Sequence, residues 1–221
     1  MAILLAAPIG AGKSTVADAL AKMTGLEVIY ESVEDNPVLP LYYQDRKRYG
    51  FHLQMYFLQR RVKDLMHGYA TETPKHPVIS DRSIVEDKDI FAKQLFETGM
   101  MNETEYKIYI DSANTSMTLL DAYRQTHSQN QQEDLLIFLN PSFERTLDQI
   151  KQRGRDFEQV DDNPELKEYY LDIYSRYQDW FKTYHRSPKI MIDDYSTDTP
   201  ADMDKLYQTI LQKTKEINYN I

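Results

Sequence analysis

One eight-residue stretch constrains this chain more than any other part of its sequence: Ala7-Pro8-Ile9-Gly10-Ala11-Gly12-Lys13-Ser14. It follows an apolar run at residues 2–6 and precedes a segment in which Val16, Leu20 and Met23 recur at helical spacing. A loop of this composition between a strand and a helix is typical of a phosphate-binding P-loop. Backbone N–H groups and a helix N-terminus together solvate a polyphosphate in such a loop. The alternative is a chance Gly-Lys-Ser turn.

Each position of the loop has an expected task. Lys13 is placed to reach the β- and γ-phosphates, and the Ser14 hydroxyl is placed to bind Mg²⁺. Ala7 stands where the pattern has its first glycine, and alanine fits there if its φ stays negative. The expected phosphate-binding residues of the loop are Ala7, Pro8, Ile9, Gly10, Ala11, Gly12, Lys13, Ser14 and Thr15.

Length and charge restrict the class of protein. The 221 residues fit one domain, 1–221, with room for a lid. The net charge of -9 argues against nucleic-acid or anionic-membrane partners, because these need a clustered cationic face. There is no Cys, and the five His residues lack ligand spacing, so protein-bound zinc is not expected. The N-terminus lacks the features of a signal peptide, and we therefore expect a cytoplasmic protein.

Apolar segments and helical patterns alternate along the chain. Strands are expected at 2–7, 26–31, 77–81, 134–139 and 189–193. Helices are expected near 13–23, 45–69, 85–97, 102–126, 142–152, 164–184 and 201–217. This order predicts a three-layer α/β fold with a five-stranded, mainly parallel sheet and helices on both faces. Ligands in such folds bind beyond the carboxyl ends of the strands.

Charged residues stand at two of these strand ends. Glu31 ends the second strand and is placed to accept the proton of an attacking hydroxyl. Asp81 ends the third strand, where an acid holds Mg²⁺ through water, and Arg82 beside it could stabilise a transferring phosphoryl group. The alternatives are a solvated acid at Glu31 and a surface Asp–Arg pair, with Ser83 as an N-cap in either case.

The helix at 45–69 carries two polar side chains at the edge of its apolar stripe. Gln54 and Arg61 lie roughly 20° apart around the helix axis. Together they suit the polar edge of a nucleobase, and Asp87 could complete the set by holding Arg61. As an isolated pair they also fit the solvated flank of a helix.

Two arginines flank a glycine after the helix at 142–152. Arg153 and Arg155 form a bendable cationic tip, which is what a lid that closes over phosphates requires, and the lid is expected at about 149–160. The alternative is an ordinary charged helix end. Aromatic residues at helical spacing over 166–184 are interpreted as core, and the stripe from Tyr106 to Leu120 fits either core or a subunit interface.

Together these motifs resemble the deoxynucleoside kinase family, most closely its bacterial deoxyadenosine/deoxyguanosine kinase branch, over nearly the whole chain. The matching residues are Pro8 to Ser14, Glu31 with Val33, Asn36 to Pro40, Tyr42-Tyr43, Gln54, Arg61, Asp81 to Ile84, Glu86-Asp87, Arg153 to Arg155 and Glu158. The resemblance implies a five-stranded parallel sheet, a homodimer, and transfer of the γ-phosphoryl group of ATP, with Mg²⁺ as cofactor, to a deoxynucleoside 5′-hydroxyl.

The resemblance also implies a role for each matching residue. Glu31 looks like the general base, Arg82 lies near the 5′-oxygen, and Asp81 lies beside the metal. Tyr43 and Glu158 match the pair that binds the 3′-hydroxyl. The base-reading set is Gln54, Arg61 and Asp87, and the lid set is Arg153 and Arg155. The thymidine-type members lack an acid where Asp87 stands, which favours a purine deoxynucleoside or deoxycytidine. Gln149 departs from the family, since many members have a further arginine there.

The leading hypothesis is therefore a salvage kinase for deoxyadenosine or a close relative, as a homodimer or as a heterodimer with a related subunit. Two alternatives stay open. A nucleoside monophosphate kinase would have to bind an acceptor phosphate, which the acidic Glu34-Asp35 neighbourhood does not favour. A non-catalytic nucleotide-binding subunit would account for the departures at Ala7 and Gln149. Feedback inhibition by the corresponding triphosphate is compatible with these residues.

Overall fold

The computed structural model describes residues 2–31, 33, 35–71, 77–128, 133–161 and 163–219. The strands are β1 (Ala2–Ala6), β2 (Val28–Ile29), β3 (Val78–Asp81), β4 (Leu135–Asn140) and β5 (Lys189–Asp193). The α-helices are α1 (Lys13–Thr24), α2 (Leu39–Gln44), α3 (Arg46–Thr71), α4 (Ile84–Glu86), α5 (Lys93–Glu97), α6 (Glu103–His127), α7 (Phe143–Arg153), α8 (Pro164–Thr183) and α9 (Pro200–Glu216). A π-helical turn, η1 (Asp87–Ala92), joins α4 to α5, and a 3₁₀ turn, η2 (Asp156–Glu158), follows α7.

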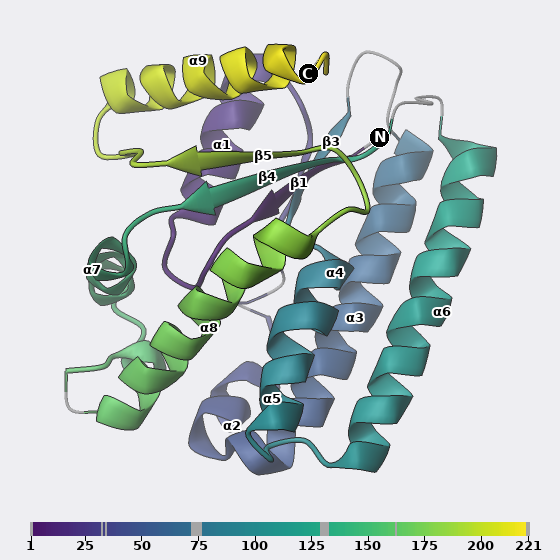
Figure 1. Ribbon diagram of the computed structural model, residues 1–221, viewed down its shortest axis with the longest axis vertical. Helices are drawn as coiled ribbons and strands as arrows, with labels where there is room; N and C mark the ends of the chain where they lie inside the picture. The colour runs from purple at the N-terminus through teal and green to yellow at the C-terminus, as the bar shows by residue number, and fades with distance from the viewer. Residues whose placement is uncertain are drawn as a thin grey trace.

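The five strands form one parallel sheet in the order β2-β3-β1-β4-β5. Alternate residues of each strand face opposite layers, as the pleat requires. Ile3 and Leu5 pack in the core that includes α1 and α9, whereas Leu4 and Ala6 pack in the core that includes α3, α6 and α8. Figure 1 shows α1 and α9 on one side of the sheet and α8, α3 and α6 on the other. Because both faces are covered, all five residues of β1 are buried.

This architecture confirms the α/β fold with a parallel five-stranded sheet that the sequence predicts. Three local differences have physical reasons. Strand β2 is shorter than 26–31, since it is an edge strand that pairs only with β3. Helix α2 was not expected, because six residues that include Pro40 show too little periodicity. The helix expected at 85–97 contains the π-helical turn, which a sequence pattern cannot distinguish from α-helix.

The two aromatic stripes differ in burial. In α8, the stripe at residues 166–184 is buried along its whole length, so its interpretation as core is confirmed. In α6, Ala113 and Leu120 are buried, whereas Tyr106, Ile110 and Met117 are only partly buried beside α3. A subunit interface on α6 stays a prediction. None of the helices in the described parts of the chain is long and apolar enough to cross a bilayer.

Candidate active site

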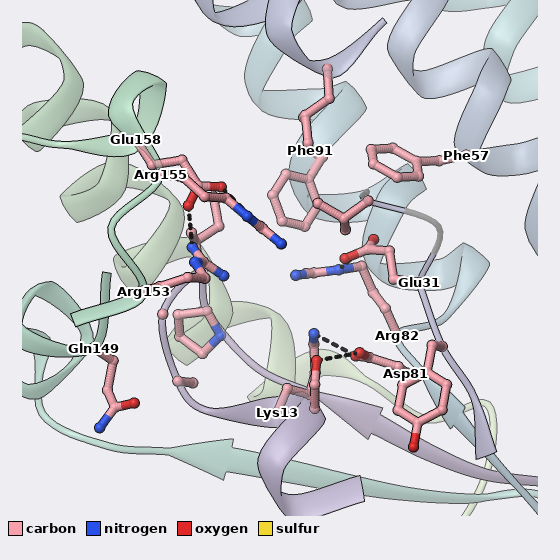
Figure 2. A pocket seen from close by; sticks show the side chains of 18 of the residues that line it. Lys13, Glu31, Phe57, Asp81, Arg82, Phe91, Gln149, Arg153, Arg155 and Glu158 are labelled. Carbon is pink, nitrogen blue, oxygen red and sulfur yellow. Dashed lines mark hydrogen bonds and ion pairs between the residues drawn. The ribbon is translucent and has the colours of Figure 1, made fainter. Parts of the chain in front are cut away.

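A cavity of about 780 Å³ opens at the carboxyl ends of β1, β2 and β3. Its wall includes the P-loop from Pro8 to Thr15, the end of β2, helices α2 and α3, the end of β3 and the lid, and Figure 2 shows their side chains around it. Most residues expected from the sequence lie on this wall: Pro8 to Thr15, Glu31, Tyr43, Gln54, Asp81, Arg82, Asp87, Arg153, Arg155 and Glu158. Ala7 and Arg61 are not part of the wall, and both lie buried behind it.

The P-loop owes its shape to glycines and to close packing. Gly10 has φ +83°, a left-handed conformation, and a Cβ at this position would lie 2.3 Å from the carbonyl oxygen of Thr146 in α7. Gly12, with φ +75°, is the N-cap of α1. Ala7 is fully buried and has no positive φ, so it meets the condition under which alanine can replace glycine. The Tyr195 hydroxyl donates to the carbonyl of Ala11 and holds the loop from beyond β5.

Three side chains meet below the loop. Lys13 Nζ lies 2.5 Å from Asp81 Oδ1, and Ser14 Oγ donates to Asp81 Oδ2 at 2.9 Å. The side chains of Lys13 and Asp81 are both more than nine-tenths buried. The parallel register that pairs β1 with β3 brings these residues together, because it places the end of β3 beside the loop that follows β1. A hydroxyl and a carboxylate oxygen thus converge beside the lysine.

Glu31 lines the same cavity beside Arg82 and above the pair of Lys13 and Asp81 (Figure 2). Its Oε1 accepts hydrogen bonds from Arg61 Nη2 at 3.0 Å and from Arg82 Nε at 3.2 Å. Burial by itself would raise the pKa of Glu31, but the charges of Arg82, Lys13 and Arg61 outweigh it and lower the pKa to about 2. The side chain is therefore a carboxylate throughout the physiological range, fixed in place by two guanidinium groups.

Arg61 organises the inner end of the cavity from behind. Its Nε and Nη2 donate to the two oxygens of Asp87 at 2.7 and 3.3 Å, and its Nη1 donates to the Asp81 carbonyl at 3.1 Å. Burial raises the pKa of Asp87, against the opposing effect of Arg61. Gln54, about two turns earlier on the same face of α3, is 4% exposed, and its Oε1 has no hydrogen-bond partner among the described residues. Such an orphaned acceptor on a cavity wall fits a ligand that donates.

Arg82 extends from the end of β3 into the middle of the cavity (Figure 2). Its backbone has φ +86°, a conformation that is unfavourable for any residue except glycine. Besides Glu31, its guanidinium contacts the face of the Phe91 ring, with Cζ 4.6 Å from the ring centroid. Nη1 donates to the carbonyl of Ala7 at 3.4 Å and to the hydroxyl of Tyr177. The side chain is thus held from several directions.

The two arginines of the expected lid both pair with one buried acid. Arg153 Nη2 lies 2.6 Å from Glu158 Oε2, and Arg155 Nη1 lies 3.4 Å from Oε1. Glu158 is 3% exposed, whereas both arginine side chains are partly exposed at the mouth of the cavity. The ring of Tyr43 lies 5.2 Å from that of Phe157. Burial raises the pKa of Tyr43 well above its usual range, so its phenol keeps the proton that it can donate.

The structure adds residues that the sequence did not single out. These are Phe57 and Leu53 from α3 and Phe91 from the π-helical turn, which line the cavity. Tyr42 and Leu39, which the resemblance matches without giving them a role, line it as well. Nothing in the apolar stripes distinguishes these side chains from ordinary core residues. Gln149 also lines the cavity. Asp35 lines it too, whereas Glu34 of the expected acidic neighbourhood lies outside the described residues.

Comparison with known proteins gives a consistent result. Residues 3–217 match the sequence model of the deoxynucleoside kinase family. The deoxyadenosine kinase of Lactobacillus acidophilus is 38% identical over 218 residues, 97% of either chain. The deoxyguanosine kinase of the same species is 35% identical over 218 residues, 97% of this chain and 91% of that one. The structure of deoxyadenosine kinase from M. mycoides with bound dATP matches with a TM-score of 0.74 and 28% identity, covering 97% of this chain and all of that one.

Proposed function

Since the chain belongs to the deoxynucleoside kinase family, we propose that it transfers the γ-phosphoryl group of ATP to the 5′-hydroxyl of deoxyadenosine. Deoxyguanosine and deoxycytidine are the further acceptors that the site admits. Membership of the family makes the chain a phosphotransferase. The proposal therefore concerns the nucleobase of the acceptor, the phosphoryl donor and the residues that carry out the transfer. The observation that carries it is a fixed carboxylate, Glu31, in the same cavity as Lys13 of the P-loop.

The polar groups of the inner cavity support an acceptor base with an exocyclic amino group. Gln54 Oε1 is a buried acceptor without a partner among the described residues, and Asp87 offers only acceptor oxygens while Arg61 holds it. An adenine, cytosine or guanine amino group donates to such oxygens, and the Gln54 amide N–H₂ can donate to a ring nitrogen. Thymine has no amino group and offers a single donor, its N3–H, so it can pair with only one of these two acceptors.

The acceptor end supports a sugar hydroxyl rather than a phosphate. Glu31, Asp87 and Glu158 line the cavity with oxygens that accept hydrogen bonds, which a sugar hydroxyl can donate and an ionised phosphate cannot. Tyr43 and Glu158 lie together near the lid, where a phenol and a carboxylate suit the 3′-hydroxyl of the sugar.

The oxygens of Ser14 and Asp81 fit Mg²⁺. A hydroxyl and a carboxylate converge there at 2.9 Å, and Mg²⁺ takes a few oxygen ligands from protein and the rest from phosphates and water. When bound, the ion would neutralise negative charge on the phosphates of the donor. Lys13 and the lid arginines would bind the same phosphates.

In the proposed reaction the 5′-oxygen forms a bond to the γ-phosphorus while the bond between that phosphorus and ADP breaks. Glu31 accepts the proton of the hydroxyl. A carboxylate with a pKa of about 2 is a weak base, so the transfer occurs late, after the attacking oxygen has become acidic. Arg82 donates hydrogen bonds to the transferring group, where charge must be stabilised.

Labelled ATP tests the proposal with the four deoxynucleosides and with deoxyadenosine monophosphate as acceptors. Deoxyadenosine should accept the label fastest, and Glu31→Gln should lower kcat by about 10²- to 10⁴-fold. Glu27→Gln is the matched control, because that carboxylate precedes the same strand but is more than half exposed and outside the cavity. Phosphorylation at the parent rate by Glu31→Gln, or a faster reaction with the monophosphate, would refute the proposal.

A further inference from the structure

The catalytic arginine proposed above needs support that its own backbone does not give. Arg82 has a left-handed backbone conformation, φ +86°, and its side chain is 6% exposed. A buried guanidinium stays in one orientation only where acceptors match its donors. Nε is matched by Glu31 on the cavity side. The orientation of the guanidinium therefore depends on the acceptors that bind Nη1, at its opposite corner.

Tyr177, in α8, provides the side-chain acceptor for that corner, in addition to the Ala7 carbonyl at 3.4 Å. Its hydroxyl accepts from Arg82 Nη1 and donates to Glu86 Oε1 at 2.8 Å. The direction of both bonds follows from chemistry, since arginine has no acceptor and a carboxylate has no proton to give. The ring is fully buried between neighbouring aromatic rings, stacked on Phe138 at 5.8 Å and edge-on to Trp180 at 5.9 Å. The hydroxyl therefore has a fixed position.

Glu86 fixes the other end of this chain of bonds. Its Oε2 accepts from the backbone N–H of Ser83 at 2.8 Å and from Ser83 Oγ at 2.9 Å, as part of the capping box of α4. Its Oε1 accepts from Tyr177 and lies 3.6 Å from Arg82 Nη1. Glu86 is fully buried, so the cation that its carboxylate faces in this part of the core is the Arg82 guanidinium.

Neither Tyr177 nor Glu86 lies on the wall of the cavity, so neither can touch a substrate there. We propose that Tyr177 and Glu86 are positioning residues for phosphoryl transfer, which orient the Arg82 guanidinium toward the transferring group. The inference rests on the proposed function, because it concerns the work of Arg82 in that reaction. The spacing of Tyr177 in α8 predicts a core residue, but its hydroxyl oxygen would in addition support phosphoryl transfer by holding Arg82.

The expected kinetic effect follows from this role. A guanidinium aimed at the transferring phosphoryl group contributes mainly in the transition state, so its misplacement lowers kcat rather than raising KM. Tyr177→Phe keeps the ring and removes one oxygen. We expect kcat to fall about 10- to 100-fold, the loss typical of a misplacement of about 1 Å, with the KM values for deoxyadenosine and ATP changed less than about twofold.

Tyr184→Phe is the matched control. Tyr184 directly follows the same helix, is buried, and its ring contacts Trp180, but its hydroxyl bonds Ser187 and not Arg82. This variant also loses one buried hydroxyl bond and should keep the parent kcat. A Tyr177→Phe variant with the kcat of the parent, or with a loss equal to that of Tyr184→Phe, overturns the inference.

A double-mutant cycle shows whether Tyr177 acts through Arg82. In an Arg82→Lys background the Nη1 atom is gone, so Tyr177→Phe should cause no further loss of kcat, and additive losses overturn the inference. If Tyr177→Phe fails to fold, Glu86→Gln replaces it in the same cycle with the same expectation. An Arg82→Lys variant at the parent rate refutes the proposed role of Arg82 itself, which is a separate result.

Discussion

The contact between the P-loop and α7 gives a sharp prediction for Gly10→Ala. A Cβ built on Gly10 would lie 2.3 Å from the backbone carbonyl oxygen of Thr146 and 2.7 Å from Ile150 Cγ1. A backbone oxygen cannot rotate away as a side chain can, so α7 or the loop must move. Both bear on the site, because the loop forms the floor of the cavity and α7 ends at the lid residue Arg153.

The size of the effect can be separated into two parts. Gly10 has φ +83°, and alanine in a left-handed conformation costs about 1–2 kcal/mol. Forcing a methyl group into a packed site adds about 1–3 kcal/mol. Gly25→Ala isolates the first part, since Gly25 has φ +74° with no atom within 4 Å of its Cβ position. We therefore expect losses in the free energy of unfolding of about 1–2 kcal/mol for Gly25→Ala and about 2–5 kcal/mol for Gly10→Ala.

Urea denaturation measures the two stabilities, and steady-state kinetics with ATP varied measures the site. The kcat/KM for ATP should fall roughly 10- to 100-fold in Gly10→Ala, because the groups that hold the phosphates are displaced, and should be unchanged in Gly25→Ala. Equal loss of stability in both variants would refute the reasoning. It would show that α7 moves away from the added methyl group with no loss in the free energy of unfolding. If Gly10→Ala keeps the kcat/KM of the parent for ATP, the expectation that the phosphate-binding groups are displaced is refuted.

Two further predictions concern the acids of the cavity. Because the pKa of Glu31 is about 2, its carboxylate stays ionised and kcat/KM should show no acid limb from this residue above about pH 4. A limb at higher pH that disappears in Glu31→Gln would contradict this. Glu158→Gln weakens the bonds to Arg153 and Arg155 and to the sugar, so the KM for deoxyadenosine should rise roughly tenfold. With 2′,3′-dideoxyadenosine, parent and variant should differ by less than twofold, and an equal tenfold rise would argue against the role in binding the 3′-hydroxyl.

The layers of the fold could be predicted because buried parallel strands are continuous apolar runs. Leu135–Leu139 is such a run, and no other element type explains it as well at that length. Helix α2 could not be predicted, since its position depends on packing against α3 rather than on a pattern of its own. The π-helical turn differs from an α-helix by one hydrogen-bond step, which residue types alone do not specify.

In the candidate site, sequence motifs identified the residues at the strand ends. They did not identify the residues that hold those side chains in place. Glu31 follows β2, Asp81 is the last residue of β3, and Arg82 comes next, so their proximity is a consequence of the parallel topology. Tyr177 gave no such signal, because a tyrosine at helical spacing is usually core and only its contact with Arg82 distinguishes it. The left-handed backbone at Arg82 is likewise a property of the folded chain, since arginine has no preference for it.

The π-helical turn between α4 and α5 has a consequence for how this pocket could change during evolution. A π-turn holds one residue more than the α-helical winding around it, so a one-residue deletion there would restore regular winding and leave both flanking helices in phase. Such a deletion would shift the Phe91 ring around the axis relative to the Asp87 carboxylate. Length variation at this turn could therefore redesign one wall of the acceptor pocket in a single step, while the sheet behind it stays intact.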